Sequence, residues 1–176
     1  VQEVLGRDDV FVVSNPEFLR EGSAVHDCLH PDRIVIGSDD QAAAMRVARL
    51  YEGLGAPLVI TDPASAETIK YASNAFLATK VSFVNALANV CEAVGADVRE
   101  VILGMGYDKR IGQSYLSPGP GWGGSCLPKD TSALLQLADS VDFEFRLLRA
   151  AIETNTRQSR RVVEKIQTAV TGKRNG

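Results

Sequence analysis

Residues 62–95 read DPASAETIKYASNAFLATKVSFVNALANVCEAVG, and this stretch predicts one long helix that starts at Asp62-Pro63 and runs to about Gly95. Its apolar residues form an arc too wide for one neighbouring surface to cover. The arc therefore predicts burial between two partners, one of which would be a second copy of the chain. The expected homodimer contact centres on Phe76, Phe83 and Leu87.

Three polar residues interrupt this arc at regular intervals. Lys70 and Asn74 lie one helical turn apart, and Asn85 follows eleven residues later on nearly the same face. A lysine and two asparagines on a largely apolar helix are costly unless they are paired or used by a ligand. A hydrated groove is the alternative interpretation.

The chain before this helix alternates between strand and helix patterns. Short apolar runs at residues 33–37 and 57–61 predict strands, and residues 41–53 between them predict a helix. This order is typical of a parallel α/β sheet that is covered on both faces. A further strand is expected at 8–14, which makes three, too few to stand alone. The chain therefore resembles the second part of a larger sheet.

Asn15-Pro16 follows the first expected strand and predicts a short helix that ends near Gly22. Such a helix would place the carboxylates of Glu17 and Glu21 on one face. The stretch from His26 to His30 holds two imidazoles and a thiol, but no second pair of zinc ligands. It is expected to be a polar loop, and no metal site is predicted.

After residue 95 the patterns are helical. Helices are expected at 97–103, 131–138 and 143–170. The inner face of the last one should consist of Leu148, Ile152, Val162, Ile166 and Val170. The predicted fold class is α/β followed by all-α. Its first domain would cover residues 1–63, as the end of a Rossmann-like parallel sheet, and a helical dimerisation domain would cover residues 64–176.

Residues 118–130 read PGPGWGGSCLPKD and carry the clearest chemical signal. Four glycines open space around the backbone, and the run then supplies Cys126, Lys129 and Asp130. A thiolate is a far better nucleophile than a thiol, and a nearby cation favours it. This stretch therefore predicts a nucleophilic cysteine. The alternative is a glycine-rich loop with an inert, buried thiol.

Gly119, Gly121 and Gly124 also fit the spacing of the dinucleotide-binding fingerprint. That fingerprint needs a buried strand before it and a helix opening inside it. Residues 113–118 make a poor strand, and Pro120 lies inside the turn, so the match is rejected. No better fingerprint occurs elsewhere, and the isolated chain is therefore expected not to bind NAD measurably.

Composition sets broad limits on function. A net charge of −3 gives no reason to expect nucleic-acid binding, and no apolar run reaches the length of a membrane span. The three cysteines show no disulfide spacing, which is typical of a reducing cytoplasm. A cytoplasmic protein without a membrane partner is expected.

Four blocks in order carry a resemblance to a known family: NPEFLREGSA at 15–24, PDRIVIG at 31–37, KYASNAFLA at 70–78 and GGSCLPKD at 123–130. Together they closely resemble the UDP-glucose/GDP-mannose dehydrogenase family over nearly all of the chain. The resemblance implies an oxidation of a nucleotide-sugar C6 alcohol to a carboxylate with two NAD. It also implies a front part of the NAD domain and a C-terminal nucleotide-sugar domain outside these residues.

The resemblance implies the role of Cys126 and the binding residues, and the chemistry and spacing of the other candidates suggest theirs. Cys126 would carry the thiohemiacetal and the thioester, Lys70 and Asn74 would stabilise the oxyanion, and Asp130 would orient water or accept a proton. Glu17 or Glu21 would be the base for the hydrolytic water. The residues implied in substrate binding are Phe18, Leu19, Arg20, Glu21, Lys70, Tyr115, Leu116, Ser117, Pro118, Gly119, Gly123 and, across the dimer, Arg110. Glu21 and Lys129 would lie near the nicotinamide.

Three interpretations remain open at this point. The first is an NAD-dependent sugar-nucleotide dehydrogenase, with UDP-glucose ahead of GDP-mannose or an N-acetylated UDP sugar as substrate. The second is a thiol hydrolase or acyltransferase built on Cys126 and Lys70, although no histidine is linked to the thiol. The third is a catalytically silent helical dimerisation fragment.

Overall fold

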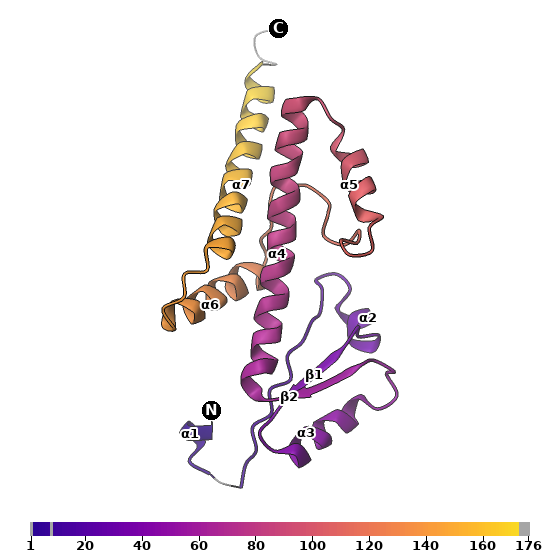
Figure 1. Ribbon diagram of the computed structural model, residues 1–176, viewed down its shortest axis with the longest axis vertical. Helices are drawn as coiled ribbons and strands as arrows, with labels where there is room; N and C mark the ends of the chain where they lie inside the picture. Colours follow the sequence, from indigo (N-terminus) through magenta and orange to yellow (C-terminus); the bar gives the residue numbers. More distant parts are fainter. Residues whose placement is uncertain (1, 8, 173–176) are drawn as a thin grey trace. The chain divides into compact units, whose positions relative to one another are not determined.

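The computed structural model describes residues 2–7 and 9–172. Residue contacts divide the chain into two compact units. The first unit ends at Ala72 and the second begins at Ser73. The elements, shown in Figure 1, are α1 (Gln2–Leu5), α2 (Ala24–Leu29), β1 (Ile34–Gly37), α3 (Gln41–Ala48), a 3-10 turn (Arg49–Tyr51), β2 (Leu58–Thr61), α4 (Pro63–Val94), α5 (Val98–Gly106), α6 (Cys126–Ser140) and α7 (Arg146–Gly172). The predicted fold class, a parallel α/β part followed by helices, is confirmed.

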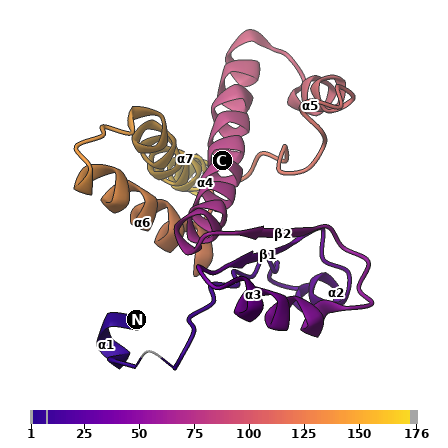
Figure 2. The ribbon, with the colours of Figure 1, turned by 60° about the horizontal axis from the view of Figure 1, so that its bottom comes forward.

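The first unit is built on two parallel strands. β1 pairs with β2 in the register Ile34 to Leu58 through Gly37 to Thr61. Ile34 and Ile36 of β1 pack with Ala44 and Ala48 of α3, which Figure 2 shows lying along the sheet. The strands expected at 33–37 and 57–61 and the helix expected at 41–53 are therefore present, and the helix ends in the 3-10 turn.

Gly37 at the end of β1 is required by packing. A Cβ there would lie 2.5 Å from Cβ of Ala66 and 2.8 Å from the carbonyl oxygen of Asp62. Such distances are too short for any real contact. Glycine therefore lets the first turns of α4 pack directly against the end of β1.

Two predictions for the start of the chain are wrong. In the strand expected at 8–14, Asp8 lies outside the described residues, and only Ser14 pairs with the sheet, in a single antiparallel bridge to Gly37. The helix expected from Asn15 to Gly22 does not form. Asn15 uses its side chain elsewhere: Nδ2 donates to the Val35 carbonyl over 2.7 Å, and Oδ1 accepts from the Tyr51 hydroxyl. Glu17 and Glu21 therefore do not share a helix face.

The expected polar loop at 26–30 is also wrong, because residues 24–29 form α2. The signal for this helix was Ser23 followed four residues later by Asp27, whose side chain is buried and bonded to the Ser23 hydroxyl over 3.1 Å. His26 and His30 lie on the exposed side, with ring centroids 4.8 Å apart.

In the second unit α7 lies alongside α4, as Figure 1 shows. Val84 of α4 and Leu148 and Ala151 of α7 are buried, and the Ser82 hydroxyl donates to the Ala151 carbonyl over 2.7 Å. Ion pairs from Glu92 to Arg161 and Lys165 join the same helices further along. α4 and α7 thus match the long helices expected at 62–95 and 143–170, and α5 matches the one expected at 97–103.

Two helix predictions in this unit need correction. α6 begins at Cys126, five residues before the expected start, because the helix continues through Pro128, which occupies its first turn and needs no amide bond there. On α7, Ile166 and Val170 are 57% and 58% exposed, so they do not belong to an inner face. Among residues 2–7 and 9–172, the contacts cover only the first half of α7.

α4 also carries an exposed apolar stripe. Phe76, Phe83, Val90 and Val94 recur on one face of this helix and are between 55% and 71% exposed. The described residues therefore leave part of the wide apolar arc of α4 uncovered.

Candidate functional site

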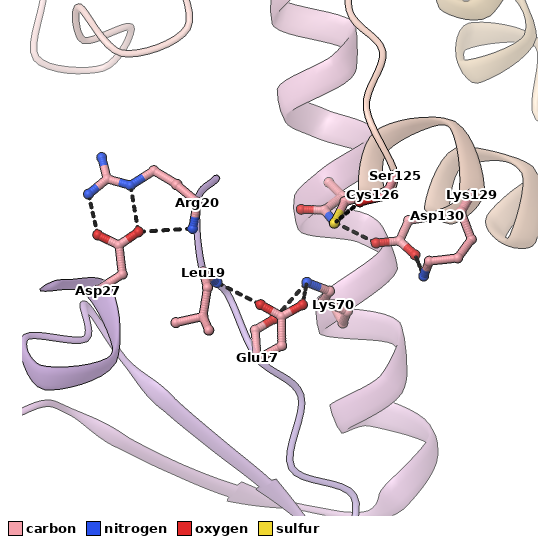
Figure 3. Close-up of polar contacts among 10 residues, drawn as sticks. Glu17, Leu19, Arg20, Asp27, Lys70, Ser125, Cys126, Lys129 and Asp130 are labelled. Atoms are coloured by element: carbon pink, nitrogen blue, oxygen red, sulfur yellow. Dashed lines mark hydrogen bonds and ion pairs between the residues drawn. The ribbon is translucent and has the colours of Figure 1, made fainter. Parts of the chain in front are cut away.

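The thiol of Cys126 lies at the first residue of α6, directly after the glycine-rich run. Gly124 has φ +80°, a left-handed conformation that glycine adopts without strain, and it turns the chain into the helix. The thiol is partly exposed, and the Ser125 hydroxyl lies 3.6 Å from its sulfur (Figure 3). Cys126 therefore lies in the first turn of α6, where the backbone N–H groups have no partner within the helix.

One turn further along α6, Asp130 is completely buried. Its Oδ2 accepts a hydrogen bond from Nδ2 of Asn74 on α4 over 2.5 Å, and its Oδ1 pairs with the ammonium of Lys129. Cys126 and Asp130 are four residues apart on one helix, so their side chains share a face. A buried carboxylate with two donors thus supports the turn that carries the thiol.

In the first unit, Lys70 contacts Glu17. Nζ of Lys70 donates to the Glu17 carbonyl over 2.6 Å and to Glu17 Oε1 over 2.8 Å, and the lysine side chain is only 15% exposed. Glu17 Oε2 in turn accepts from the Leu19 amide over 2.7 Å (Figure 3). Since an ammonium has three N–H donors, Glu17 accounts for two of them.

The residues after Glu17 form no helix or strand, and side chains hold them. The Arg33 guanidinium stacks 3.7 Å from the centre of the Phe18 ring. Arg20 makes a two-pronged ion pair with Asp27, at 2.5 and 2.9 Å (Figure 3). The Arg20 guanidinium, helped by the Arg20 amide and the Ser23 hydroxyl, holds the pKa of the Asp27 carboxyl well below its usual range.

Side chains of α4 and α7 hold the glycine-rich run by hydrogen bonds. The Gly119 amide donates to Asn85 Oδ1 over 2.7 Å, and Gln158 Nε2 donates to the Gly119 carbonyl over 2.8 Å. Asn155 binds both the amide and the carbonyl of Trp122, at 2.7 and 2.8 Å. At Gly121, which has φ +121°, a Cβ would lie 2.7 Å from Asn155 Oδ1.

The segment before this run is held from α4 as well. Nζ of Lys80 donates to the carbonyls of Ile111 and Ser114 over 3.0 and 2.7 Å. Tyr115 adopts a left-handed φ of +61°, and Leu116 is buried. Arg110 projects from the same connection and pairs with Asp108 over 2.6 Å.

The predicted site residues thus form two groups. Glu17, Phe18 and Lys70 come together in the first unit, and Asn74, Lys129 and Asp130 come together in the second, next to Cys126 on α6. Neither Glu21 nor Gly123 takes part in the hydrogen bonds and the ring contact that define these two groups. Sequence reasoning missed Asp27 and the polar residues of α7 that bind the run. Asn155, Gln158 and Ser159, whose hydroxyl donates to the Pro120 carbonyl over 3.0 Å, recur at helical spacing, and this recurrence of polar residues was the available signal.

Comparison with known families identifies the chain. Residues 64–157 match the central domain of the UDP-glucose/GDP-mannose dehydrogenase family, and residues 2–55 match the NAD binding domain of the same family. The protein belongs to the UDP-glucose/GDP-mannose dehydrogenase family, as the four sequence blocks predict.

Individual relatives agree with this assignment. The chain is 54% identical over 165 residues to the UDP-glucose 6-dehydrogenase TuaD of Bacillus subtilis, covering 94% of this chain and 36% of that protein. It is 48% identical over 162 residues to the UDP-glucose 6-dehydrogenase of Rickettsia conorii, covering 92% and 38%. The solved UDP-glucose dehydrogenase of Pyrobaculum islandicum superposes with a TM-score of 0.88 at 42% identity, covering 92% and 37%. The chain therefore spans little more than a third of the length of these relatives.

A dinucleotide needs free amides at a strand-to-helix turn for its pyrophosphate, and two such turns occur in the described part of the first unit. Both are already capped by aspartates. Asp40 accepts from the Ala43 amide over 2.6 Å at α3, and Asp62 accepts from the Ser65 amide over 2.8 Å at α4. Because these amides already donate to aspartates, neither turn fits the pyrophosphate of NAD. That the isolated chain does not bind NAD stays a prediction.

Within residues 2–7 and 9–172, no group of three or more histidine, cysteine, aspartate or glutamate side chains is arranged to hold a metal ion. None of the helices described there is both long and apolar enough to cross a membrane.

Proposed function

We propose that the whole protein is an NAD-dependent UDP-glucose 6-dehydrogenase, which oxidises the C6 alcohol of the sugar to the acid and yields UDP-glucuronate. The observation that carries the proposal is Cys126 at the start of α6, one turn from the buried Asp130 and its partner Asn74. The names of the relatives, at 54% and 48% identity, support UDP-glucose as the substrate. When bound, NAD would accept the hydride.

Cys126 has a defined task in this chemistry. Its thiolate adds to the carbonyl carbon of the sugar aldehyde, so that a C–S bond forms and the oxygen takes the negative charge and then a proton. Oxidation at C6 converts this thiohemiacetal into a thioester. Water then attacks the acyl carbon, the C–S bond breaks, and the thiol and the carboxylate are released.

Asp130, held by Asn74, would orient water or accept a proton, and Asn74 would help to stabilise the oxyanion. We assign the oxyanion to Lys70, whose third N–H donor Glu17 does not occupy. Glu17 or Glu21 would be the base in thioester hydrolysis, and the hydrogen bond between Glu17 and Lys70 favours Glu17. A carboxylate in this position could accept the proton of the attacking water.

The remaining roles follow the family resemblance. Phe18 to Glu21, Tyr115 to Gly119, and Gly123 would line the sugar nucleotide, and Arg110 would reach it from the partner subunit. Glu21 and Lys129 would lie near the nicotinamide. The contacts that fix Gly119 and Phe18 support this assignment. A surface that is ordered before the ligand arrives loses less conformational entropy on binding.

We also propose that two copies associate through the exposed stripe of α4, and that the protein works in the cytoplasm. Phe76 and Phe83 are 66% and 55% exposed, which is unusual for large apolar side chains that recur on one helix face. We likewise propose that the first domain ends at residue 63 and that the helical domain begins at residue 64.

One assay tests the function directly. The full-length protein is mixed with NAD and, in separate reactions, with UDP-glucose, GDP-mannose or UDP-N-acetylmannosamine, and NADH is followed by absorbance. We expect two NADH for each UDP-glucose and little turnover of the other two. No NADH from any of the three sugars would contradict the proposal and favour the thiol hydrolase or the silent dimerisation module.

A further inference from the structure

Asp27 on α2 is a buried carboxylate without a role in the chemistry above. It is 8% exposed and accepts four hydrogen bonds. The donors are the Arg20 amide and Nε, both at 2.9 Å, Arg20 Nη2 at 2.5 Å and the Ser23 hydroxyl at 3.1 Å. One side chain thus collects donors from two residues that precede it in the chain.

These bonds fix the backbone around Arg20. The Arg20 amide donates to Asp27, and the Arg20 carbonyl accepts from the Ser23 amide over 3.1 Å. Gly22, with φ +89°, completes the reversal between them. Residue 20 is therefore held at its amide, its carbonyl and its guanidinium, and Asp27 is the acceptor for two of the three.

The opposite end of segment 17–23 has its own anchors. Lys70 holds Glu17 from α4, and Arg33 stacks on Phe18. No helix or strand forms between the two ends. A segment without backbone pairing loses much conformational entropy when it is ordered, so the contacts at its ends decide whether it keeps one conformation.

We propose that Asp27 is a positioning residue for nucleotide-sugar binding: it acts through Arg20 to hold segment 17–23 in its binding conformation. This inference rests on the proposed function, which assigns Phe18 to Glu21 to the nucleotide sugar. Asp27 itself is covered and does not touch the ligand. Its loss therefore acts on binding before it acts on the chemical step.

The first test needs no substrate. Hydrogen exchange followed by mass spectrometry on the full-length protein reports the amides of residues 17–23 in the native protein and in Asp27→Asn. We expect exchange there to become about tenfold faster or more, because the Arg20 amide loses its charged acceptor. Asp39→Asn is the matched control, since it removes the same charge from an exposed turn of the same unit.

The second test uses steady-state kinetics with UDP-glucose and saturating NAD. For Asp27→Asn we expect the KM for UDP-glucose to rise about tenfold, while kcat stays within about threefold. A merely structural role would lower the amount of active protein and leave KM unchanged. If Asp27→Asn does not fold, Arg20→Ala removes the other, exposed partner of the pair and is expected to show the same split.

Unchanged exchange in segment 17–23 overturns the inference, and so does an unchanged KM in a folded variant. An Asp27→Asn/Arg20→Ala double variant whose effect on KM equals the product of the single effects also overturns it, because residues that act through one contact are not independent. If the native protein does not oxidise UDP-glucose, the proposed function fails, and the exchange result alone then decides the inference.

Discussion

Asn74 on α4 donates a hydrogen bond to Asp130 on α6 over 2.5 Å, and the receiving carboxylate is completely buried. The two residues are 56 positions apart in the chain, so this bond fixes the helix that starts with Cys126 against the long helix. The buried carboxylate needs both of its donors, because an unpaired charge inside a protein is costly. Two predictions concern α6, the helix that begins with Cys126.

Replacing Asp130 by asparagine should destabilise the protein. The amide keeps the shape, but its NH2 group must face either Asn74 Nδ2 or Lys129 Nζ, both of which are donors. An unmet buried donor costs about 1–3 kcal/mol, which lowers the melting temperature by several degrees in a chain of this size. Calorimetry on the 176-residue chain measures the effect.

Asp139→Asn is the control on the same helix, since Asp139 pairs with Arg149 on the surface. Its effect should stay within about 0.5 kcal/mol. Equal melting temperatures for Asp130→Asn and the native chain would show that the buried pair contributes nothing to stability.

Lys70→Ala should reduce kcat of the full-length enzyme by about 100-fold, the effect of removing one preorganised oxyanion donor. Since Lys70 also holds Glu17, a pure anchoring role would instead raise the KM for the sugar nucleotide and spare kcat. Steady-state kinetics separate the two outcomes. Lys165→Ala, which removes an exposed lysine bound to Glu92, is the control and should leave both constants unchanged.

Phe83→Glu should separate the proposed dimer into monomers or cause aggregation. Phe83 lies in the middle of the exposed stripe on α4, where a carboxylate would have to be buried against the partner copy. Sedimentation of the native chain and the variant provides the measurement. A native chain that stays monomeric at high concentration would refute the interface.

The ion pair of Asp27 and Arg20 predicts a pH dependence of stability. Because the pKa of Asp27 is lowered in the folded protein, its contribution is present above the unfolded pKa of about 3.9 and is lost as pH falls below that value. Asp27→Asn should therefore lower the melting temperature at pH 7, and the difference from the native protein should shrink below about pH 4. A difference that grows as the pH falls would contradict this assignment.

Much of the fold could be predicted because local pattern and tertiary structure agree. The apolar runs at 33–37 and 57–61 and the long pattern at 62–95 correspond to β1, β2 and α4. β1 is stabilised by burial of its apolar residues, whereas Leu58, Val59 and Ile60 of β2 are 40–43% exposed and are held by pairing with β1. The end of α7 is different, since Ile166 and Val170 repeat like core residues but are exposed. A hydrophobic pattern does not reveal whether its partner lies within the same chain.

The errors fall where side chains from distant parts of the chain decide the structure. Asn15 and Pro16 are good residues for a helix start, but Asn15 binds Val35 and Tyr51 instead, 20 and 36 positions away. The contact between Asp27 and Arg20 joins residues only seven positions apart, but it was missed because residues 17–23 form no helix or strand and so show no periodic pattern. Cys126, Lys70, Asn74 and Asp130 could be proposed because their chemistry is unusual for their surroundings. Their partners could not, since hydrogen-bond partners are set by the three-dimensional fold.

The covalent role of Cys126 is the central claim, and intact-protein mass spectrometry during turnover of UDP-glucose with NAD tests it most directly. We predict an acyl adduct on the native full-length enzyme that maps to Cys126, and none on Cys126→Ala. Cys126→Ser should still bind the sugar nucleotide but stall at the second oxidation or the hydrolysis, because its hydroxyl is a much poorer nucleophile. If Cys126→Ala still converts the alcohol fully to the acid at a near-native rate, the thiol has no covalent role.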